Sequence, residues 1–335
     1  MFDKQKKLPS SEYFRRIAPL ADELRVRKNS FDIDLKNNFL SRERFVVICG
    51  PCSADEPDAM KEYVSKLSSL SARCKSLLTV ARIYTAKPHS NGSGYLGTCF
   101  NLNENESADL GKGIIRCRQM MINCIENNLP VADELLYPEL YDYFSDLVSY
   151  WFIGARSGED SLHRAFASGL DVCCGVKNGT DGDLYKAADS LRAISNPNVF
   201  PFNGYQIETN GCRYAHVVLR GGVSYARGET AYFSNIDSNS VSRIKTLLKT
   251  RGLNDFIIAD LNHANSGKVA KRQIENVKEV VNNTSINGVM LESYLFEGEK
   301  STEYGVSRTD GCLSIEDTEL VFGYLQRFLS EREKQ

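Results

Sequence analysis

Eight short apolar runs, separated by segments of helical periodicity, constrain the fold of this chain more than any other feature. Continuous runs of this kind are typical of buried parallel strands, because the helices that connect the strands cover the outside of the sheet. Eight strand–helix units favour a closed (βα)8 TIM barrel of the α/β class over an open, doubly wound sheet. The runs are FVVIC (45–49), TVARIY (79–84), PVADEL (130–135), WFIGAR (151–156), CCGVKN (173–178), HVVLRG (216–221), FIIADLN (256–262) and GVMLES (288–293).

Two segments fall outside this alternation. Residues 1–40 are polar and interrupted by Pro9 and Pro19, so we expect an N-terminal extension before a barrel domain at 41–335. Near 198–209, two short β-like runs flank Asn203-Gly204, which is the strongest short hairpin signal, and we place an inserted β-hairpin there, in a βα loop. After the first run, Ser53 and Glu56 form a potential capping box for a helix.

Charge and hydropathy exclude several classes of protein. The formal charge of −2 gives no excess of Lys and Arg, so we expect neither nucleic-acid binding nor attraction to a membrane surface. No window approaches the roughly 18 apolar residues of a membrane span, and the N-terminus has no apolar signal region. We therefore expect a cytoplasmic protein with reduced cysteines, whose partners are small molecules and copies of itself.

Basic residues recur at or just beyond the ends of the predicted strands. In a barrel these ends meet at one face, which is where barrel enzymes carry their chemistry. A phosphate together with a carboxylate would neutralise such a cluster, and arginine can bind both through paired hydrogen bonds. Each cation taken alone has a simpler explanation as a solvated or ion-paired side chain. The cluster comprises Arg82, Lys87, Arg156, Lys177 and Arg220.

A second set of strand-end residues could bind a metal: Cys52, His263, Glu292 and Asp310. They are far apart in the sequence, so no local ligand spacing supports them. Each has a simpler explanation when taken alone. Cys52 could be a core residue and His263 a capped loop histidine, while Glu292 could pair with a cation and Asp310 could cap a helix or turn. Together, at one end of a barrel, sulfur, nitrogen and oxygen donors suit Mn²⁺, Fe²⁺, Co²⁺ or Zn²⁺. His163 and His216 are more readily interpreted as structural.

The motifs at these strand ends resemble those of a known family, the type I 3-deoxy-D-arabino-heptulosonate 7-phosphate (DAHP) synthases, which start the shikimate pathway. The resemblance runs from about Val46 to Asp317. Its motifs occur in one order: GPCS (50–53), GAR (154–156), KNGTDG (177–182), LRGG (219–222), HANS (263–266), ES (292–293) and TD (309–310).

The resemblance implies the reaction and the roles of the residues. In this family, C3 of phosphoenolpyruvate attacks the aldehyde carbon of erythrose 4-phosphate, a metal polarises the aldehyde oxygen, water adds at C2 and phosphate leaves. By this resemblance Cys52, His263, Glu292 and Asp310 hold the metal and Glu134 orders water. We hypothesise that Lys177 donates a proton to the forming alkoxide. It also implies a homodimer or homotetramer. The residues implied to hold phosphoenolpyruvate are Arg82, Lys87, Ala155, Arg156, Lys177 and Arg220.

The sequence departs from the family at the acceptor end, where the aldehyde would meet His89, Ser90 and Asp310. Family members have Arg-Thr after Lys87-Pro88, and those residues bind the acceptor phosphate; here the pair is His89-Ser90. Losing a charge-assisted contact of this kind costs roughly 2 to 5 kcal/mol. We keep erythrose 4-phosphate as the default acceptor, and the alternative acceptor is an unphosphorylated or modified short aldehyde in a specialised pathway. Two other functions stay open: a non-catalytic regulatory paralogue, and a sugar-phosphate isomerase or lyase on the same barrel.

Feedback control is a further point of departure. Family members often bind an aromatic amino acid beside the extra hairpin. Phe202 and Asp171 stand where the sensitive enzymes have small hydroxyl residues, so the sequence predicts weak or absent inhibition by phenylalanine and tyrosine.

Overall fold

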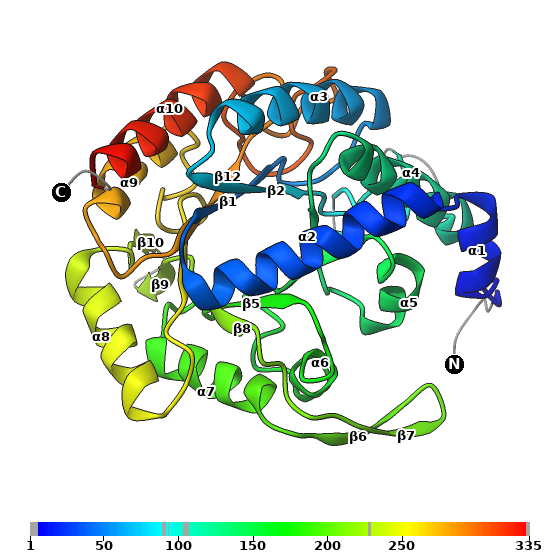
Figure 1. Cartoon of the computed structure of the whole chain (residues 1–335), viewed down its shortest axis with the longest axis horizontal. Coiled ribbons are helices and arrows are strands. Elements are labelled where there is room, and N and C mark those ends of the chain that lie inside the picture. The colour runs from blue at the N-terminus through cyan, green and yellow to red at the C-terminus, as the bar shows by residue number, and fades with distance from the viewer. Residues whose placement is uncertain (1–5, 89–91, 93, 103–106, 227–228, 333–335) are drawn as a thin grey trace.

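The computed structural model describes residues 6–88, 92, 94–102, 107–226 and 229–332. Eight parallel strands close into a barrel in the order β1-β12-β11-β8-β5-β4-β3-β2 (Figure 1). The predicted TIM barrel is therefore confirmed, with each predicted run containing or overlapping a barrel strand. The strands are β1 (Phe45–Gly50), β2 (Leu77–Arg82), β3 (Val131–Glu134), β4 (Val148–Ile153), β5 (Cys173–Lys177), β8 (Ala215–Leu219), β11 (Ile257–Asp260) and β12 (Gly288–Glu292).

Helices connect successive strands and surround the barrel (Figure 1). None of the described helices is both long enough and apolar enough to cross a membrane. The connecting helices are α3 (Pro57–Arg73), α4 (Leu110–Glu126), the 3-10 turn η1 (Pro138–Leu140) with α5 (Tyr141–Phe144), α6 (Ser161–Ala167), α7 (Leu184–Ser195), α8 (Ser238–Thr250) and α9 (Arg272–Val281), followed by α10 (Ile315–Arg332).

Alternate residues of each strand serve two different cores. In β1, Val47 and Cys49 join the layer between the barrel and its helices, whereas Val46 and Ile48 point into the barrel interior. This follows from the two-residue period of a strand, and it explains why the runs are apolar throughout. The interior is filled with side chains and so forms a rigid support for the residues at its end.

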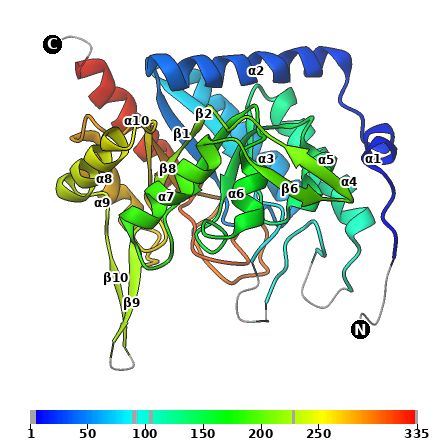
Figure 2. The ribbon, with the colours of Figure 1, turned by 90° about the horizontal axis from the view of Figure 1, so that it is seen from below.

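The N-terminal extension forms α1 (Ser11–Ile17) and α2 (Asp22–Ser41), and α2 lies across one end of the barrel (Figures 1 and 2). Its side chains Leu35 and Phe39 are buried with the inward-facing residues of the strands. Phe39 stacks on Phe256, which precedes β11, with ring centroids 4.8 Å apart. The extension therefore closes the end of the barrel at which the strands begin, and leaves the opposite end free.

Two hairpins interrupt the alternation, and one prediction about them was wrong. The predicted hairpin exists as β6 (Val199–Phe202) and β7 (Tyr205–Glu208), but it follows α7 and precedes β8, so it lies in an αβ connection instead of a βα loop. The Asn203-Gly204 signal located the turn without showing at which end of the barrel it lies. The second hairpin, β9 (Gly222–Ala226) and β10 (Glu229–Phe233), was not predicted and projects on the side away from α2 (Figure 2).

The capping box predicted after β1 is also absent. Helix α3 begins with Pro57 at its first turn and has no side-chain cap at Glu56. Ser53 instead contacts Asp55 and Thr309. Proline is already suited to the first helical position, because it lacks the N–H that a cap would satisfy.

Candidate active site

The strand ends opposite α2 carry the predicted site residues. Arg82, Glu134, Lys177 and Glu292 are the last residues of β2, β3, β5 and β12. Others follow a strand directly or by a few residues: Cys52, Lys87, Ala155, Arg156, Arg220 and His263, with Asp310 further along the segment after β12. His89 and Ser90 lie outside the described residues. The fold thus places these residues at one end of the barrel, while their individual roles stay predictions.

Two ion pairs are buried at this end. Nη1 of Arg82 lies 2.5 Å from Oε1 of Glu292, and Nζ of Lys177 lies 2.9 Å from Oδ2 of Asp260. Burial alone would raise the pKa of Glu292, but Arg82, then His263 and Lys87, lower it to about 2. Both acids are therefore carboxylates at neutral pH, each balancing one of the cations.

Asp260 is the principal residue that the sequence reasoning missed. It lies 2.9 Å from Lys177 and its Oδ2 is also 2.8 Å from Nδ1 of His263. Burial would raise the pKa of Asp260, yet His263 and Lys177 hold it well below its usual range. The signal was present in FIIADLN, where an acid ends a buried apolar strand and must find a partner at the barrel mouth.

Among the described residues, no buried carboxylate pairs directly with Lys87 or Arg220. Lys87 donates from Nζ to the carbonyl oxygen of Cys52 at 2.9 Å and to its Sγ at 3.1 Å. In Arg220, Nε and Nη1 are buried and have no hydrogen-bond partner among the described residues. Burial lowers the pKa of Arg220, and the neighbouring Arg156 lowers it further while Asp260 opposes them. A buried guanidinium with free donors is costly unless an anion binds it.

An amide network fixes the backbone around Arg220. Its N–H donates to Oδ1 of Asn178 at 2.8 Å, and the same oxygen accepts from Nδ2 of Asn235 at 3.1 Å. Asn265 donates from Nδ2 to the carbonyl of Leu219 at 3.0 Å. Asn178 and Asn265 belong to the KNGTDG and HANS motifs, so these two motif residues hold the backbone at the end of β8 in place. Asn235 was not singled out from the sequence.

Glu134 is half-buried against the start of the GAR motif. A Cβ at Gly154 would lie 1.9 Å from Oε1 of Glu134, so any larger residue there would force this carboxylate to move. Burial alone would lower the pKa of Lys87, and the negative charge of Glu134 is among the effects that raise it. The carboxylate therefore faces the cationic cluster.

The predicted metal donors do not form a coordination shell in this arrangement. Within the described ranges, no three His, Cys, Asp or Glu side chains lie close enough together to hold an ion. Nε2 of His263 is 3.8 Å from Oε1 of Glu292, whereas Sγ of Cys52 accepts from Lys87 and Asp310 pairs with Lys268 at 3.2 Å.

The chemistry of these donors nevertheless suits a divalent ion. Glu292 is ionised, and burial lowers the pKa of His263, which favours the neutral imidazole that binds metals. Burial and then Glu292 raise the pKa of Cys52, so its thiol would have to release a proton on binding an ion. The donor types fit the group, and small side-chain movements would be needed to assemble them.

His163 and His216, which the sequence favoured as structural, contact residues outside the predicted site. His163 lies 2.6 Å from Asp160 and 3.0 Å from the carbonyl of Leu136, on α6. His216 is buried inside the barrel, where it contacts Tyr150 and the carbonyl of Tyr214.

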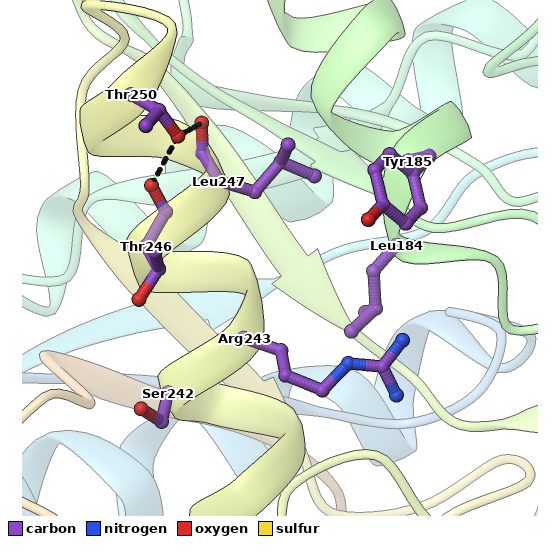
Figure 3. Close-up of a pocket in the computed structure, with 7 residues that line it drawn as sticks. All are labelled: Leu184, Tyr185, Ser242, Arg243, Thr246, Leu247 and Thr250. Carbon is purple, nitrogen blue, oxygen red and sulfur yellow. Dashed lines mark hydrogen bonds between the residues drawn. The ribbon is translucent and has the colours of Figure 1, made fainter.

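Several clefts in the described part of the chain lie on the outside of the barrel, away from the C-terminal ends of the strands. One, of about 350 Å³, runs between α7 and α8 and is lined by Tyr185, Arg243 and threonines including Thr250, which bonds back to its own helix (Figure 3). Another, of about 320 Å³, lies between α6 and the β6–β7 hairpin and is lined in part by Phe166 and Phe202. The aromatic side chain of Phe202 thus occupies the region that the feedback prediction concerns, and that prediction stays open.

A barrel that gathers buried cations, ion-paired carboxylates, a thiol and an imidazole at one end is an enzyme scaffold for a small anionic substrate. Residues 36–323 match the model of the DAHP synthetase I family, and the chain belongs to that family. The resemblance seen in the motifs is thereby confirmed.

Individual relatives agree with the family match. The chain is 34% identical to the phospho-2-dehydro-3-deoxyheptonate aldolase, Tyr-sensitive, of Salmonella typhimurium, with 86% of this chain and 83% of the relative covered. It is equally identical to the phenylalanine-inhibited enzyme of Saccharomyces cerevisiae, over 87% and 83% of the two chains. Among solved structures, a phospho-2-dehydro-3-deoxyheptonate aldolase from Francisella tularensis superposes with a TM-score of 0.90 at 28% identity, covering 98% of this chain and 99% of that one.

Proposed function

We propose that this chain condenses phosphoenolpyruvate with an aldose phosphate, by default erythrose 4-phosphate, and releases phosphate. The observation that carries the proposal is the surplus of cations at the barrel mouth. Arg82 and Lys177 are each paired with a buried carboxylate, whereas Lys87 and Arg220 are not. A phosphate group of about −2 together with a carboxylate would supply the missing negative charge.

The substrate-binding residues would be Arg82, Lys87, Ala155, Arg156, Lys177 and Arg220. Arg220 offers two buried nitrogen donors with no partner in the described part of the chain, which suits a bidentate contact with an anion. Its backbone N–H is held by Asn178, so the backbone that carries the guanidinium is fixed before substrate arrives. This arrangement supports binding without a large reorganisation.

Cys52, His263, Glu292 and Asp310 would hold a divalent ion, Mn²⁺, Fe²⁺, Co²⁺ or Zn²⁺. When bound, the ion supplies a Lewis acid for the aldehyde oxygen. Asp310 would also face the acceptor aldehyde, with His89 and Ser90.

Proton transfer falls to groups of the chain. Lys177 is a candidate donor to the oxygen that becomes an alkoxide when C3 of phosphoenolpyruvate attacks the aldehyde carbon. Asp260 holds Nζ of Lys177 at 2.9 Å, which orients the amine. Glu134 would order the water that adds at C2 before phosphate leaves. His263 would serve the reaction through the metal.

The direct test is turnover by the purified protein with Mn²⁺. Consumption of phosphoenolpyruvate with an equal release of phosphate, dependent on erythrose 4-phosphate, is the expected result. The control is the Arg220→Leu variant, which should lose turnover at low phosphoenolpyruvate. Consumption of neither substrate, with phosphoenolpyruvate still bound, would instead indicate a non-catalytic regulatory paralogue.

A second candidate reaction is the same condensation on an unphosphorylated or modified short aldehyde. The presence of His89-Ser90, in place of the family's Arg-Thr, favours it. Erythrose should then be used with a higher kcat/KM than erythrose 4-phosphate. We also propose that the protein acts in the cytoplasm as a homodimer or homotetramer, which light scattering on the purified protein would test.

A further inference from the structure

One aromatic ring lies beneath three of the cations at the barrel mouth. Tyr84, two residues beyond the end of β2, points into the barrel and is 1% exposed. The guanidinium carbon of Arg82 lies 3.9 Å from the centroid of its ring. Nζ of Lys177 and Nζ of Lys87 lie 5.8 Å and 6.0 Å from the same centroid.

The ring can hold these cations through its electron-rich face. Cation–π attraction acts within about 6 Å of a ring centroid and is strongest where water is excluded. Arg82 benefits most, because its guanidinium is the nearest of the three cations to the ring of Tyr84, and it also pairs with the carboxylate of Glu292 at 2.5 Å. Like charges would otherwise push Arg82, Lys87 and Lys177 apart before an anion reaches them.

The hydroxyl of Tyr84 contributes no such contact. Its oxygen is buried and has no hydrogen-bond partner among the residues that the structure describes. The ring is instead packed beside Phe152, with centroids 5.9 Å apart. The ring face is therefore the part of this side chain that meets the site.

We propose that Tyr84 is a positioning residue for the phosphoenolpyruvate site, and that the face of its ring keeps Arg82, Lys87 and Lys177 arranged for the substrate's anionic groups. The inference rests on the proposed function and adds to it a residue that does not itself touch the substrate. It assigns no role to the tyrosine hydroxyl.

The barrel interior offers matched controls. Tyr150 lies in the same interior, is similarly buried and neighbours Phe152 at 4.6 Å, but it contacts His216 and none of the three cations. Tyr150→Leu therefore removes a buried ring without removing a cation–π contact. Tyr84→Phe keeps the ring face and removes only the hydroxyl.

The experiment is calorimetric titration of phosphoenolpyruvate into the Mn²⁺-loaded full-length protein without any aldehyde. Tyr84→Leu should weaken binding about 10- to 30-fold, the loss expected for a desolvated cation–π contact. Tyr84→Phe and Tyr150→Leu should stay within about 3-fold of the unmodified protein. With aldehyde present, Tyr84→Leu should raise KM for phosphoenolpyruvate far more than it lowers kcat.

A second series guards against misfolding of the leucine variant. Phenylalanine analogues with increasing numbers of ring fluorines at position 84 keep the ring's shape while weakening its negative face. Affinity for phosphoenolpyruvate should fall with each added fluorine. Constant affinity across the series, or equal losses in Tyr84→Phe or Tyr150→Leu, would overturn the proposal.

The outcome also separates this inference from the proposed function. Failure of the unmodified protein to bind phosphoenolpyruvate would overturn both. Binding by the unmodified protein that Tyr84→Leu leaves unchanged would overturn the role of Tyr84 alone.

Discussion

Replacing Asp260 with asparagine should damage both stability and turnover, because one carboxylate serves two neighbours. Its Oδ2 lies 2.9 Å from Nζ of Lys177 and 2.8 Å from Nδ1 of His263. At an effective dielectric constant of about 20, a charge pair at this distance is worth roughly 6 kcal/mol before desolvation. Breaking a buried pair by removing one partner typically costs about 3–5 kcal/mol.

The pH dependence of this loss follows from Asp260 itself. Burial would raise the pKa of Asp260, but His263 and Lys177 hold it well below its usual range. The carboxylate therefore stabilises the fold above its unfolded pKa of about 3.9, and this contribution is lost as pH falls through the lower folded pKa. Asparagine does not titrate, so the deficit of Asp260→Asn should be about 1 kcal/mol smaller at pH 3 than at pH 7.

Two assays check this prediction. Urea unfolding at pH 7 and pH 3 measures the deficit in unfolding free energy, which should be about 3–5 kcal/mol at pH 7 and about 1 kcal/mol smaller at pH 3. Consumption of phosphoenolpyruvate measures kcat, which should fall about 10²- to 10⁴-fold if Lys177 transfers a proton. The control is Asp133→Asn, because Asp133 is equally buried but bonds Thr85 and backbone N–H groups, with no direct cation contact. A full-strength kcat in Asp260→Asn, or equal kcat losses in the two variants, would refute the reasoning.

Four other predictions follow from single residues or sites. Arg220→Leu should weaken phosphoenolpyruvate binding by about 30-fold or more in calorimetry, yet raise the urea midpoint of the ligand-free protein, since an unpaired buried charge disappears; a lower midpoint would contradict this. Chelation with EDTA should abolish turnover and Mn²⁺ should restore it, whereas Cys52→Ala should fail to bind one equivalent of Mn²⁺ in a metal assay. Burial lowers the pKa of His216 to about 4, against the opposing carbonyl of Tyr214. The group therefore takes up a proton on unfolding below pH 6.5, and the unfolding free energy should drop by about 2 kcal/mol between pH 7 and pH 5, a slope that His216→Gln should remove. Phenylalanine and tyrosine should inhibit turnover weakly at most, because Phe202 stands where the sensitive enzymes have a small hydroxyl residue. Its ring packs against Phe166, with centroids 5.0 Å apart. Strong inhibition by either amino acid would show that prediction to be wrong.

The sequence predicted the barrel well because its evidence was periodic and redundant. Eight separate runs each indicated a buried strand, so small errors at their ends did not alter the conclusion. The hairpin after α7 and the helix cap before α3 were harder, because each depended on one local signal. Asn203-Gly204 specifies a turn but not its place in the barrel. Helix α3 begins at Pro57, without the capping box that Ser53 and Glu56 were expected to form.

The site was predicted in part for a related reason. Residues that end a strand, such as Arg82 and Glu292, have positions that the barrel itself determines. Asp260 and Tyr84 were overlooked because they lie within apolar runs, where a single polar or aromatic residue looks like core. Their purpose depends on contacts with residues on other strands, Lys177 and Arg82 among them, that no local pattern reveals.

The same contrast explains where this chain can have changed its substrate. The proposed phosphoenolpyruvate site lies at strand termini supported by a packed interior, so an altered charge there would disturb buried ion pairs such as Arg82–Glu292. The proposed acceptor site involves the connection between β2 and α4, which includes His89 and Ser90 and in which the described residues form no helix or strand. Loops tolerate substitution more readily than buried strands, and they often carry specificity. A change of aldehyde is therefore the functional change that this fold could accept at least cost to its stability.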